Sequence, residues 1–256
     1  MEVFVENGLA GCELARQRGT VTLVVDALRA SAMVTSLFHY GTQRLLVVRE
    51  VEEAFAEREG QTGVLLVGER GGPMVPGFDL GNSPLQQAPD RDISKLLFSS
   101  SNCSRCCVGV AGLPAFLAST VNATAVARTV LAICENVGKQ ELVIVTAGSA
   151  DDEALLTIED HVAAGAILAA CENQGATVSV GNDRAEVCRL AFGDGTQEWV
   201  TERFTQSQNG LRLARLGLGT DVEFASRLDV FDLVVRIDGV LPLRSGGQGA
   251  LLLRHG

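Results

Sequence analysis

Short apolar runs rich in valine, leucine and isoleucine alternate along this chain with segments that have the periodicity of helices. The clearest runs are Val21–Val25, Leu45–Val48, Val64–Val67, Leu96–Phe98 and Leu142–Val145. Strands that are apolar on both faces belong to sheets covered by helices on both sides, and crossover helices make such strands parallel. The pattern therefore predicts an α/β protein with three layers, α/β/α, around a mainly parallel or mixed central sheet.

The segments between and after these runs predict helices and a C-terminal hairpin. The helical segments are Ala32–Tyr40, Glu52–Arg58, Ala123–Asn136, Ile158–Asn173 and most of residues 182–228. Phe231–Ile237 and Val240–Leu243 flank Asp238-Gly239, a dipeptide typical of tight turns, and predict a hairpin. No repeat or charged linker divides the chain, so we expect residues 1–256 to form one domain.

The charge and the apolar content exclude several classes of protein. The chain has 256 residues and a formal net charge of −10, and no basic run offsets this charge. This argues against a nucleic-acid partner. No apolar run reaches the ~18 residues that indicate a membrane span. Met1–Gly19 lacks the basic start and apolar core of a signal peptide. We therefore expect a cytoplasmic protein without membrane partners, and a homo-oligomer stays open.

The segment Gly68–Pro84 has the composition of a long loop. It holds three of the six prolines and five glycines, and it directly follows an apolar run. A loop at the end of a buried strand is where α/β proteins place their chemistry. Glu69-Arg70-Gly71-Gly72 predicts a charged binding site whose glycines let a ligand approach the backbone, the alternative being a turn with a surface salt bridge. Asp79, Asn82 and Ser83 can equally be turn caps.

Polar residues also follow other predicted strands. Asp26 and Arg29 follow Val21–Val25, Ser99–Asn102 follows Leu96–Phe98, and Thr146 follows Leu142–Val145. If these strands are parallel, their carboxyl ends share one edge and the polar groups converge on one cleft. Asp26 could ligate a divalent cation or act as a base or nucleophile, while Arg29 and Ser31 hold an anion at a helix N-terminus. The alternative is a local ion pair with Ser31 as the N-cap.

Two further clusters have a functional and a structural interpretation. Glu159 and Asp160 open a predicted helix, where they offer oxygen ligands for Mg²⁺ or simply favour the helix N-terminus. Cys103 and Cys106 have the CxxC spacing of zinc or redox sites, but no second pair completes a zinc site, and buried thiols on a helix are the alternative. Nothing pairs His161 with a nucleophile, which disfavours a Ser-His-Asp triad. The chain has no phosphate-binding glycine motif of a nucleotide cofactor.

Several segments together resemble the 2-phosphosulfolactate phosphatase family, almost end to end. Val24–Ser31 is similar to the family's DVLRAT/S segment. Gly68–Gly72 with Pro76–Pro84 is similar to its GERGG…PGFDLGNSP signature, which is the most specific match. The weaker matches are Val121–Ala127, Ile158–Asp160 with Ala163–Ala166, and Ser207–Gly210 with Asp221 and Phe224-Ala225.

The resemblance implies a Mg²⁺-dependent acid phosphatase with an α/β/α fold that hydrolyses 2-phospho-3-sulfolactate to 3-sulfolactate and phosphate. Family members serve coenzyme M biosynthesis or bacterial sulfolactate formation. By this resemblance we expect catalytic roles for Asp26, Arg29, Glu69 and Arg70, substrate binding by Ser31, Ser101 and Asn102, and metal binding by Asp26, Glu69 and Glu159 or Asp160. Whether Asp26 attacks the substrate or only holds the metal stays open.

Three positions depart from the family pattern. Asn102-Cys103 stands where Asn-Gly is usual, Asn209 replaces a histidine, and Val235-Arg236 stands where Val-Pro is common. The first departure touches a predicted anion-binding loop, since cysteine is sterically less free than glycine, and it leaves the exact substrate open. The alternative function is a non-catalytic or altered-specificity binder of small anionic phosphorylated metabolites. A third is a thiol-redox protein that uses Cys103 and Cys106.

Overall fold

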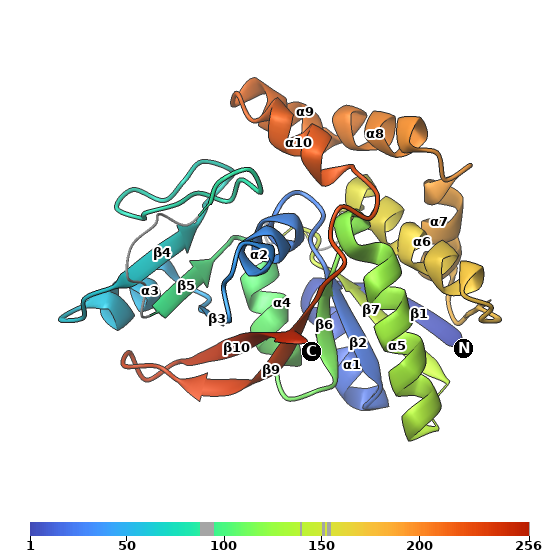
Figure 1. The fold of residues 1–256 in the computed structure, drawn as a ribbon, viewed down its shortest axis with the longest axis horizontal. Helices are drawn as coiled ribbons and strands as arrows, with labels where there is room; N and C mark the ends of the chain where they lie inside the picture. Colours follow the sequence, from blue (N-terminus) through green and yellow to red (C-terminus); the bar gives the residue numbers. More distant parts are fainter. Residues whose placement is uncertain (88–94, 139, 150–151, 153–154, 256) are drawn as a thin grey trace.

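The computed structural model describes residues 1–87, 95–138, 140–149, 152 and 155–255, and in these residues ten strands form one sheet (Figure 1). The strand order is β4-β5-β3-β10-β9-β6-β2-β7-β1-β8. The strands are β1 Glu2–Asn7, β2 Val21–Val25, β3 Arg44–Val47, β4 Val64–Gly68, β5 Lys95–Ser99, β6 Ala115–Ala118, β7 Glu141–Thr146, β8 Ser179–Val180, β9 Val234–Pro242 and β10 Gln248–His255. The helices are α1 Gly8–Arg18, α2 Ala30–His39, α3 Val51–Arg58, α4 Cys103–Val110, α5 Ala123–Val137, α6 Ile158–Asn173, α7 Asp183–Phe192, α8 Gln197–Gln206, α9 Gln208–Arg215 and α10 Gly219–Ala225. A short 3₁₀ helix covers Thr120–Asn122.

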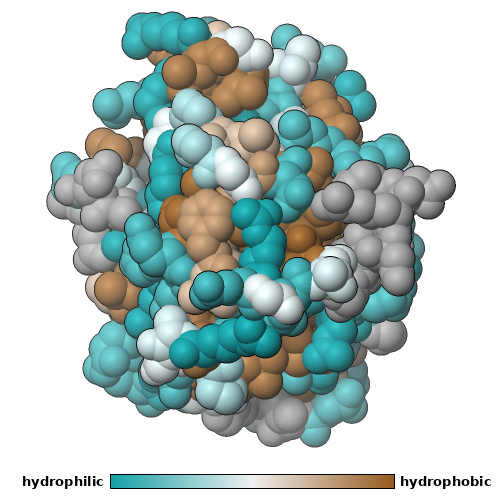
Figure 2. All heavy atoms as spheres, turned by 90° about the vertical axis from the view of Figure 1, so that its left-hand side faces the viewer, coloured by the Kyte–Doolittle hydropathy of each residue, from teal (hydrophilic) through white to brown (hydrophobic). Residues whose placement is uncertain are grey.

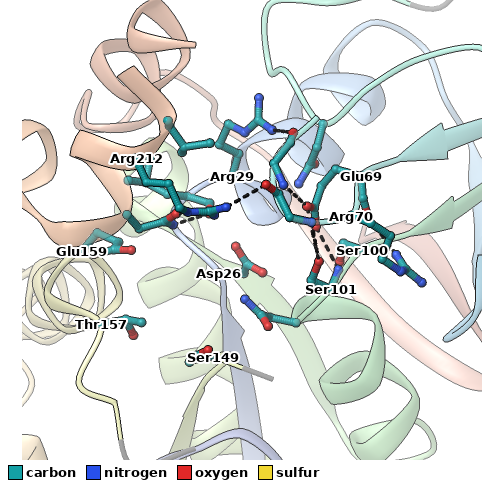
Figure 3. Close-up of a pocket in the computed structure, with 18 of the residues that line it drawn as sticks. Asp26, Arg29, Glu69, Arg70, Ser100, Ser101, Ser149, Thr157, Glu159 and Arg212 are labelled. Atoms are coloured by element: carbon teal, nitrogen blue, oxygen red, sulfur yellow. Dashed lines mark hydrogen bonds between the residues drawn. The ribbon is translucent and has the colours of Figure 1, made fainter. Parts of the chain in front are cut away.

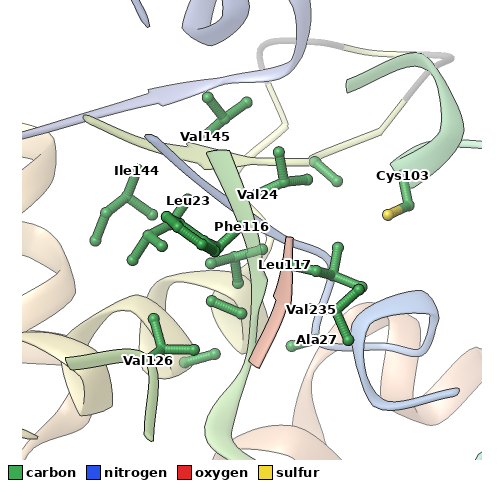
Figure 4. Packing of buried hydrophobic residues seen from close by; sticks show 14 of the residues in the cluster. Leu23, Val24, Ala27, Cys103, Phe116, Leu117, Val126, Ile144, Val145 and Val235 are labelled. Atoms are coloured by element: carbon green, nitrogen blue, oxygen red, sulfur yellow. The ribbon is translucent and has the colours of Figure 1, made fainter. Parts of the chain in front are cut away.

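Helices cover both faces of the sheet, which confirms the predicted three-layer α/β/α architecture. On one face, Gly11 of α1 lies so close to β7 that a Cβ there would be 3.0 Å from Val145. On the other, Val126 of α5 packs in the same cluster as Leu23 and Ile144 (Figure 4). Successive side chains of a strand point to opposite faces, and the inner strands are buried throughout. They therefore contribute to hydrophobic layers above and below the sheet.

The sequence predicts most of these elements, and the C-terminal hairpin is the main error. The five apolar runs form β2, β3, β4, β5 and β7, and the four predicted helices form α2, α3, α5 and α6. However, β9 continues through Asp238-Gly239 without turning. The chain turns instead at residues 243–247, where Gly246 has a φ of 86° and its amide donates to the carbonyl of Leu243. The second strand of the hairpin is β10.

The hairpin of β9 and β10 lies in the middle of the sheet and divides it into two parallel groups. The strands β4, β5 and β3 are parallel to one another, and so are β6, β2, β7, β1 and β8. Three antiparallel pairings, β3 with β10, β10 with β9 and β9 with β6, separate the groups. The two groups therefore run in opposite directions. The sheet is mixed, and the expectation of one shared carboxyl edge is wrong.

The twist of the sheet explains how loops of both groups can still meet. Neighbouring strands rotate by roughly 20–25° in one sense, so the six steps from β4 to β2 add up to about 120–150°. A rotation of this size largely cancels the reversal of direction between the two groups. The carboxyl ends of β4 and β5 and those of β2 and β7 consequently face the same region of the molecule.

The loop after β4 returns along the free edge of this strand. The amides of Asp79 and Leu80 donate to the carbonyl of Leu66, and the carboxylate of Asp79 accepts from the amide of Leu66 at 2.9 Å. The loop therefore covers an edge that would otherwise expose unpaired backbone groups. On the side of α3 and β4, hydrophobic residues are interspersed with hydrophilic ones (Figure 2), a distribution that is ordinary for a protein surface.

The predicted helical segment 182–228 forms α7 to α10. Figure 1 shows α8, α9 and α10 at one end of the molecule, beyond the end of α6. Across the described ranges, none of the helices combines the length and the apolar character needed to cross a membrane.

Candidate active site

A cavity of about 820 Å³ lies where the loops after β2, β4, β5 and β7 meet α9. Its lining includes predicted site residues from four separate segments, namely Asp26, Arg29, Glu69, Arg70, Ser101, Asn102 and Glu159. Ser31 and Asp160 are not part of the lining. The other polar lining residues are Arg49, Glu50, Asn82, Ser100, Arg105, Ser149, Thr157, Gln208, Asn209, Arg212 and Arg215. The expectation that polar groups after several strands converge on one cleft is confirmed.

Asp26 stands in the middle of this cavity, between Glu159 and Ser101 and below Arg29 (Figure 3). Its side chain follows β2 directly, and the residue is only 7% exposed. Burial, together with the charges of Glu69 and Glu159, raises the pKa of Asp26 from 3.8 to about 7. The amides of Ala30 and Cys103 oppose this rise in pKa. The carboxyl group of Asp26 is therefore partly protonated at physiological pH. A cation beside it would favour the charged form and lower this pKa.

Ser31 closes the loop that carries Asp26. Its hydroxyl accepts a hydrogen bond from the amide of Asp26 at 3.0 Å, and its own amide donates to the carbonyl of Asp26 at 2.9 Å. The alternative interpretation of Ser31 as an N-cap is wrong, because α2 begins at Ala30 and Arg29 precedes it without a side-chain cap. Ser31 is fully buried, so it supports the loop from outside the cavity.

Glu69 joins the loop after β4 to the loop after β5. Its carboxylate accepts from the amide of Gly72 at 2.7 Å and from the amide of Ser101 at 2.8 Å, and the hydroxyl of Ser101 adds a contact at 3.3 Å. Gly72 has a φ of 103°, a conformation that favours glycine. The alternative of a turn with a surface salt bridge is wrong, because Glu69 is buried and its carboxylate binds these amides.

The two predicted arginines also bind protein groups. Arg70 donates to the carbonyl of Arg49 at 2.7 Å and to the hydroxyl of Ser99 at 2.8 Å. Arg29 is 3% exposed and forms an ion pair with Asp221 at 2.5 Å, while its other terminal nitrogen donates to the carbonyl of Gly72. The alternative interpretation of a local ion pair between Asp26 and Arg29 is wrong, because Arg29 pairs with Asp221 instead.

The two acids at the start of α6 have different surroundings. Glu159 borders the cavity, and burial raises its pKa although hydrogen bonds with Asn209 and Ser207 oppose this. Asp160 accepts hydrogen bonds from the amide of Ala27 at 2.8 Å, the hydroxyl of Thr157 at 2.9 Å and the amide of Gly148 at 3.3 Å. Burial and the charge of Asp26 raise the pKa of Asp160. Asp160 thus ties the loops after β2 and β7 to α6.

Sequence reasoning missed four arginines of the lining. Arg49 directly follows the apolar run Leu45–Val48, so the rule of polar residues after strands could have found it. Arg105 lies within α4, two residues after Cys103, and donates to the carbonyl of Ser149 at 3.1 Å. Arg212 and Arg215 come from α9, and no local sequence pattern predicts that this helix lies over the cavity. Among the described residues the lining contains six arginines and four carboxylates, which suits it to an anion.

Arg212 also connects α9 to the loop after β4. Its guanidinium donates to the carbonyl of Gly71 and to the side-chain oxygen of Asn209, both at 2.7 Å. Asn209 donates to the carbonyl of Leu28 at 3.1 Å. These bonds fix the helix against the loops on either side of the cavity (Figure 3).

The oxygen atoms of the lining match the ligands of a hard divalent cation. Asp26 and Glu159 have pKa values raised by burial, and the side-chain oxygen of Asn82 is buried without a hydrogen-bond partner. In the described ranges no three acidic, cysteine or histidine side chains form a ready-made metal cluster. Mg²⁺ usually needs only one or two carboxylates and takes its other ligands from water and substrate phosphate. The residues present therefore fit Mg²⁺.

The seven cysteines are buried, and none of them is among the residues that line the cavity. All seven are free and buried, as the alternative of buried thiols predicts. Cys103 and Cys106 lie on α4, and hydrogen bonds with the thiols of Cys107 and Cys12, together with burial, raise the pKa of both well above the ordinary value. A reactive thiol needs a lowered pKa and access to solvent. The interpretation of CxxC as a redox pair therefore has no support.

Comparison with known proteins identifies the family of this chain. Residues 11–239 match the family described as 2-phosphosulpholactate phosphatase. A protein of Deinococcus radiodurans is 37% identical over 84% of this chain and 86% of its own length. A protein of Symbiobacterium thermophilum is 31% identical over 91% and 95%, and one of Carboxydothermus hydrogenoformans 29% identical over 87% and 88%. All three carry the name "Probable 2-phosphosulfolactate phosphatase". The chain belongs to the 2-phosphosulfolactate phosphatase family, a family of phosphoric monoester hydrolases.

Proposed function

We propose that this member of the family hydrolyses 2-phosphosulfolactate to 3-sulfolactate and inorganic phosphate with the help of Mg²⁺. The observation that carries the proposal is the cavity around Asp26, which gathers six arginines among the described residues of a chain whose net charge is −10. The substrate bears a phosphate, a sulfonate and a carboxylate. Guanidinium groups match such oxyanions because their N–H donors bind two oxygens at once.

We assign Mg²⁺ to the oxygen ligands Asp26 and Glu159, with Asn82 as a further oxygen on the lining. When bound, the cation neutralises phosphate charge and acidifies water. Asp26, with a pKa of about 7, can hold or accept a proton near neutral pH. Glu69 keeps the amides of Gly72 and Ser101 in place, so that the loops after β4 and β5 keep a fixed spacing.

The rest of the lining binds and orients the anion. Ser101 and Asn102 precede α4, whose N-terminus adds backbone donors with a positive partial charge. Arg212 and Arg215 supply guanidinium groups from the opposite wall. A phosphate and a second anionic group can therefore be held on two sides of Asp26, which places the ester bond near this carboxylate.

Phosphate release from purified protein tests the proposal. The substrates are 2-phosphosulfolactate and 2-phospholactate, which lacks the sulfonate, each with Mg²⁺ or with EDTA. We expect release that depends on Mg²⁺, is fastest with 2-phosphosulfolactate, and is lost in Asp26→Asn. Binding of 2-phosphosulfolactate without release from any substrate would instead support a non-catalytic binder of phosphorylated metabolites. Release that is indifferent to EDTA would remove the metal from the proposal and leave the hydrolysis.

A further inference from the structure

Asp221 binds two of the loops that form the cavity, although it lies on α10 outside it. One carboxylate oxygen pairs with the guanidinium of Arg29 at 2.5 Å. The other accepts the hydroxyl of Ser83 at 2.6 Å. Asp221 is 3% exposed, and Arg29 is equally buried. A single side chain thus joins the loop of Asp26, the loop after β4 and the helical segment 182–228.

The ordinary explanations for such an aspartate do not account for these contacts. Asp221 is the third residue of α10, where an acid favours the helix dipole. Yet both of its oxygens accept hydrogen bonds from residues outside the helix. Nor is a buried ion pair an efficient way to stabilise a fold, because the loss of hydration of both charges offsets their attraction. The pair is better explained by what it does to the position of Arg29.

Arg29 keeps binding capacity after it has paired with Asp221. A guanidinium has five N–H donors in a planar fork, and Arg29 uses one for Asp221 and one for the carbonyl of Gly72. In the described part of the chain its other donors have no protein acceptor. Since Arg29 borders the cavity, these donors are available to an anion. The two protein bonds fix the plane of the fork and therefore the direction of the free donors.

We propose that Asp221 is a positioning residue that orients Arg29 for binding of the phosphoryl group, with Ser83 fixing the rotamer of Asp221. Of these two residues only Arg29 contacts the substrate, and Asp221 acts through it. The same contacts hold the loop after β4 at the correct distance, since Ser83 belongs to that loop. This inference rests on the proposed phosphatase activity.

A double-mutant cycle on kcat/KM separates positioning from a structural role, because residues that act through one another are not additive. The variants are Asp221→Asn, Arg29→Met and the double variant. We expect Asp221→Asn to lower kcat/KM by roughly 100-fold, as misplacement of a binding group by about 1 Å does. In the Arg29→Met background the same change should have less than about a threefold effect. A full additional loss in that background would overturn the proposal.

Product binding supplies a readout apart from turnover. The inhibition constant of inorganic phosphate should rise in Asp221→Asn as in Arg29→Met, and should rise no further in the double variant. The control is Asp79→Asn, which removes the ion pair between the loop after β4 and Arg58 of α3 at 3.2 Å. This variant should keep wild-type kcat/KM and phosphate inhibition. Equal losses in Asp79→Asn and Asp221→Asn would show that only the loop fold matters and would contradict positioning.

Ser83→Ala keeps the test decisive if Asp221→Asn does not fold. This change leaves the charge pair intact, frees the rotamer of Asp221 and removes the acceptor of a long hydrogen bond from the amide of Leu85 at 3.4 Å. We expect kcat/KM to fall by about threefold to tenfold in wild type and to stay unchanged in the Arg29→Met background. An unaltered kcat/KM in the Ser83→Ala protein would contradict the proposal. If the wild-type protein releases no phosphate from any substrate, the proposed function itself fails, which is a different outcome.

Discussion

Replacing Asp26 by asparagine should stabilise the protein while it abolishes the activity. Asp26 is 7% exposed, and burial with the neighbouring charges of Glu69 and Glu159 raises its pKa from 3.8 to about 7. Asparagine has nearly the same shape and keeps an oxygen that can accept from the amide of Ala30. The substitution removes the charge and leaves no packing void. The side chain to which we assign the chemistry is therefore one without which the fold should be more stable.

The magnitude and its dependence on pH follow from the pKa values. Because the folded protein holds this proton more tightly than the unfolded chain, stability falls as pH rises from about 4 to about 7. A shift of about three pKa units lowers the free energy of unfolding by about 4 kcal/mol at pH 8, where the carboxylate is ionised in both states. At pH 5 Asp26 is ionised only in the unfolded chain, and the loss of free energy of unfolding is about 2 kcal/mol. The asparagine variant should thus gain about twice as much free energy of unfolding at pH 8 as at pH 5.

Urea unfolding in EDTA at pH 5 and pH 8 measures this difference. The control is Asp194→Asn, because hydrogen bonds from Thr196 lower the pKa of this exposed aspartate. An acid with a lowered pKa stabilises the protein at high pH and loses this effect as pH falls, so the control should change stability in the opposite direction. Saturating Mg²⁺ should stabilise wild type more than Asp26→Asn, since the cation offsets the cost of the charge.

Two results would refute the reasoning on Asp26. A loss of stability in Asp26→Asn at pH 8 would mean that the charged carboxylate is well compensated by protein groups. An equal gain at pH 5 and pH 8 would mean that the effect does not arise from ionisation. The charge of Asp26 also raises the pKa of Asp160. Its removal should therefore make Asp160 easier to ionise, which adds to the gain and cannot reverse it.

Two other changes test the loop after β4 and the thiols. Gly68→Ala should destabilise the protein by more than about 3 kcal/mol in urea unfolding, because the φ of Gly68 is 148° and its Cβ would be 1.8 Å from the carbonyl oxygen of Ser99. Gly71→Ala, with a φ of 61° and open space around it, should cost only about 1 kcal/mol, and equal losses would contradict this account. Cys106→Ala should keep kcat within about twofold of wild type, since the thiol is fully buried with a raised pKa. Inactivation of the native protein by a thiol reagent would restore the redox interpretation.

The sequence predicts those parts of the site that depend on local rules. Polar residues directly after buried strands point to the cavity, and this rule finds Asp26, Glu69, Ser101 and Asn102. Local rules do not predict the direction of a side chain. The hydroxyl of Ser31 turns back to the amide of Asp26, and whether it does so depends on the path of the loop. Residue type and spacing therefore predict the segments of the site better than the role of each residue.

Elements that depend on tertiary pairing are harder to predict. The strand β6 has the sequence Ala-Phe-Leu-Ala, which contains good helix formers, and it is a strand because β2 and β9 pair with it on both sides. The prediction of the hairpin turn is wrong for a similar reason. Asp238-Gly239 is a common turn signal, but Gly246 has the positive φ that the observed turn uses. Two local signals compete there, and pairing of β10 with β3 favours the second.

The arrangement of charge explains how an acidic protein can hold a polyanion. The lining contains six of the 21 basic residues among its described positions, two more than its carboxylates. Charges farther away than about 8–10 Å are largely screened at physiological ionic strength. The surface acids therefore weaken the approach of an anion only at long range, while the arginines act on it inside the cavity. Because Arg29 is held by Asp221 and Arg70 by backbone carbonyls, part of this positive charge is fixed before the substrate arrives. The substrate then does not have to order those side chains, a cost that a set of free surface arginines would impose.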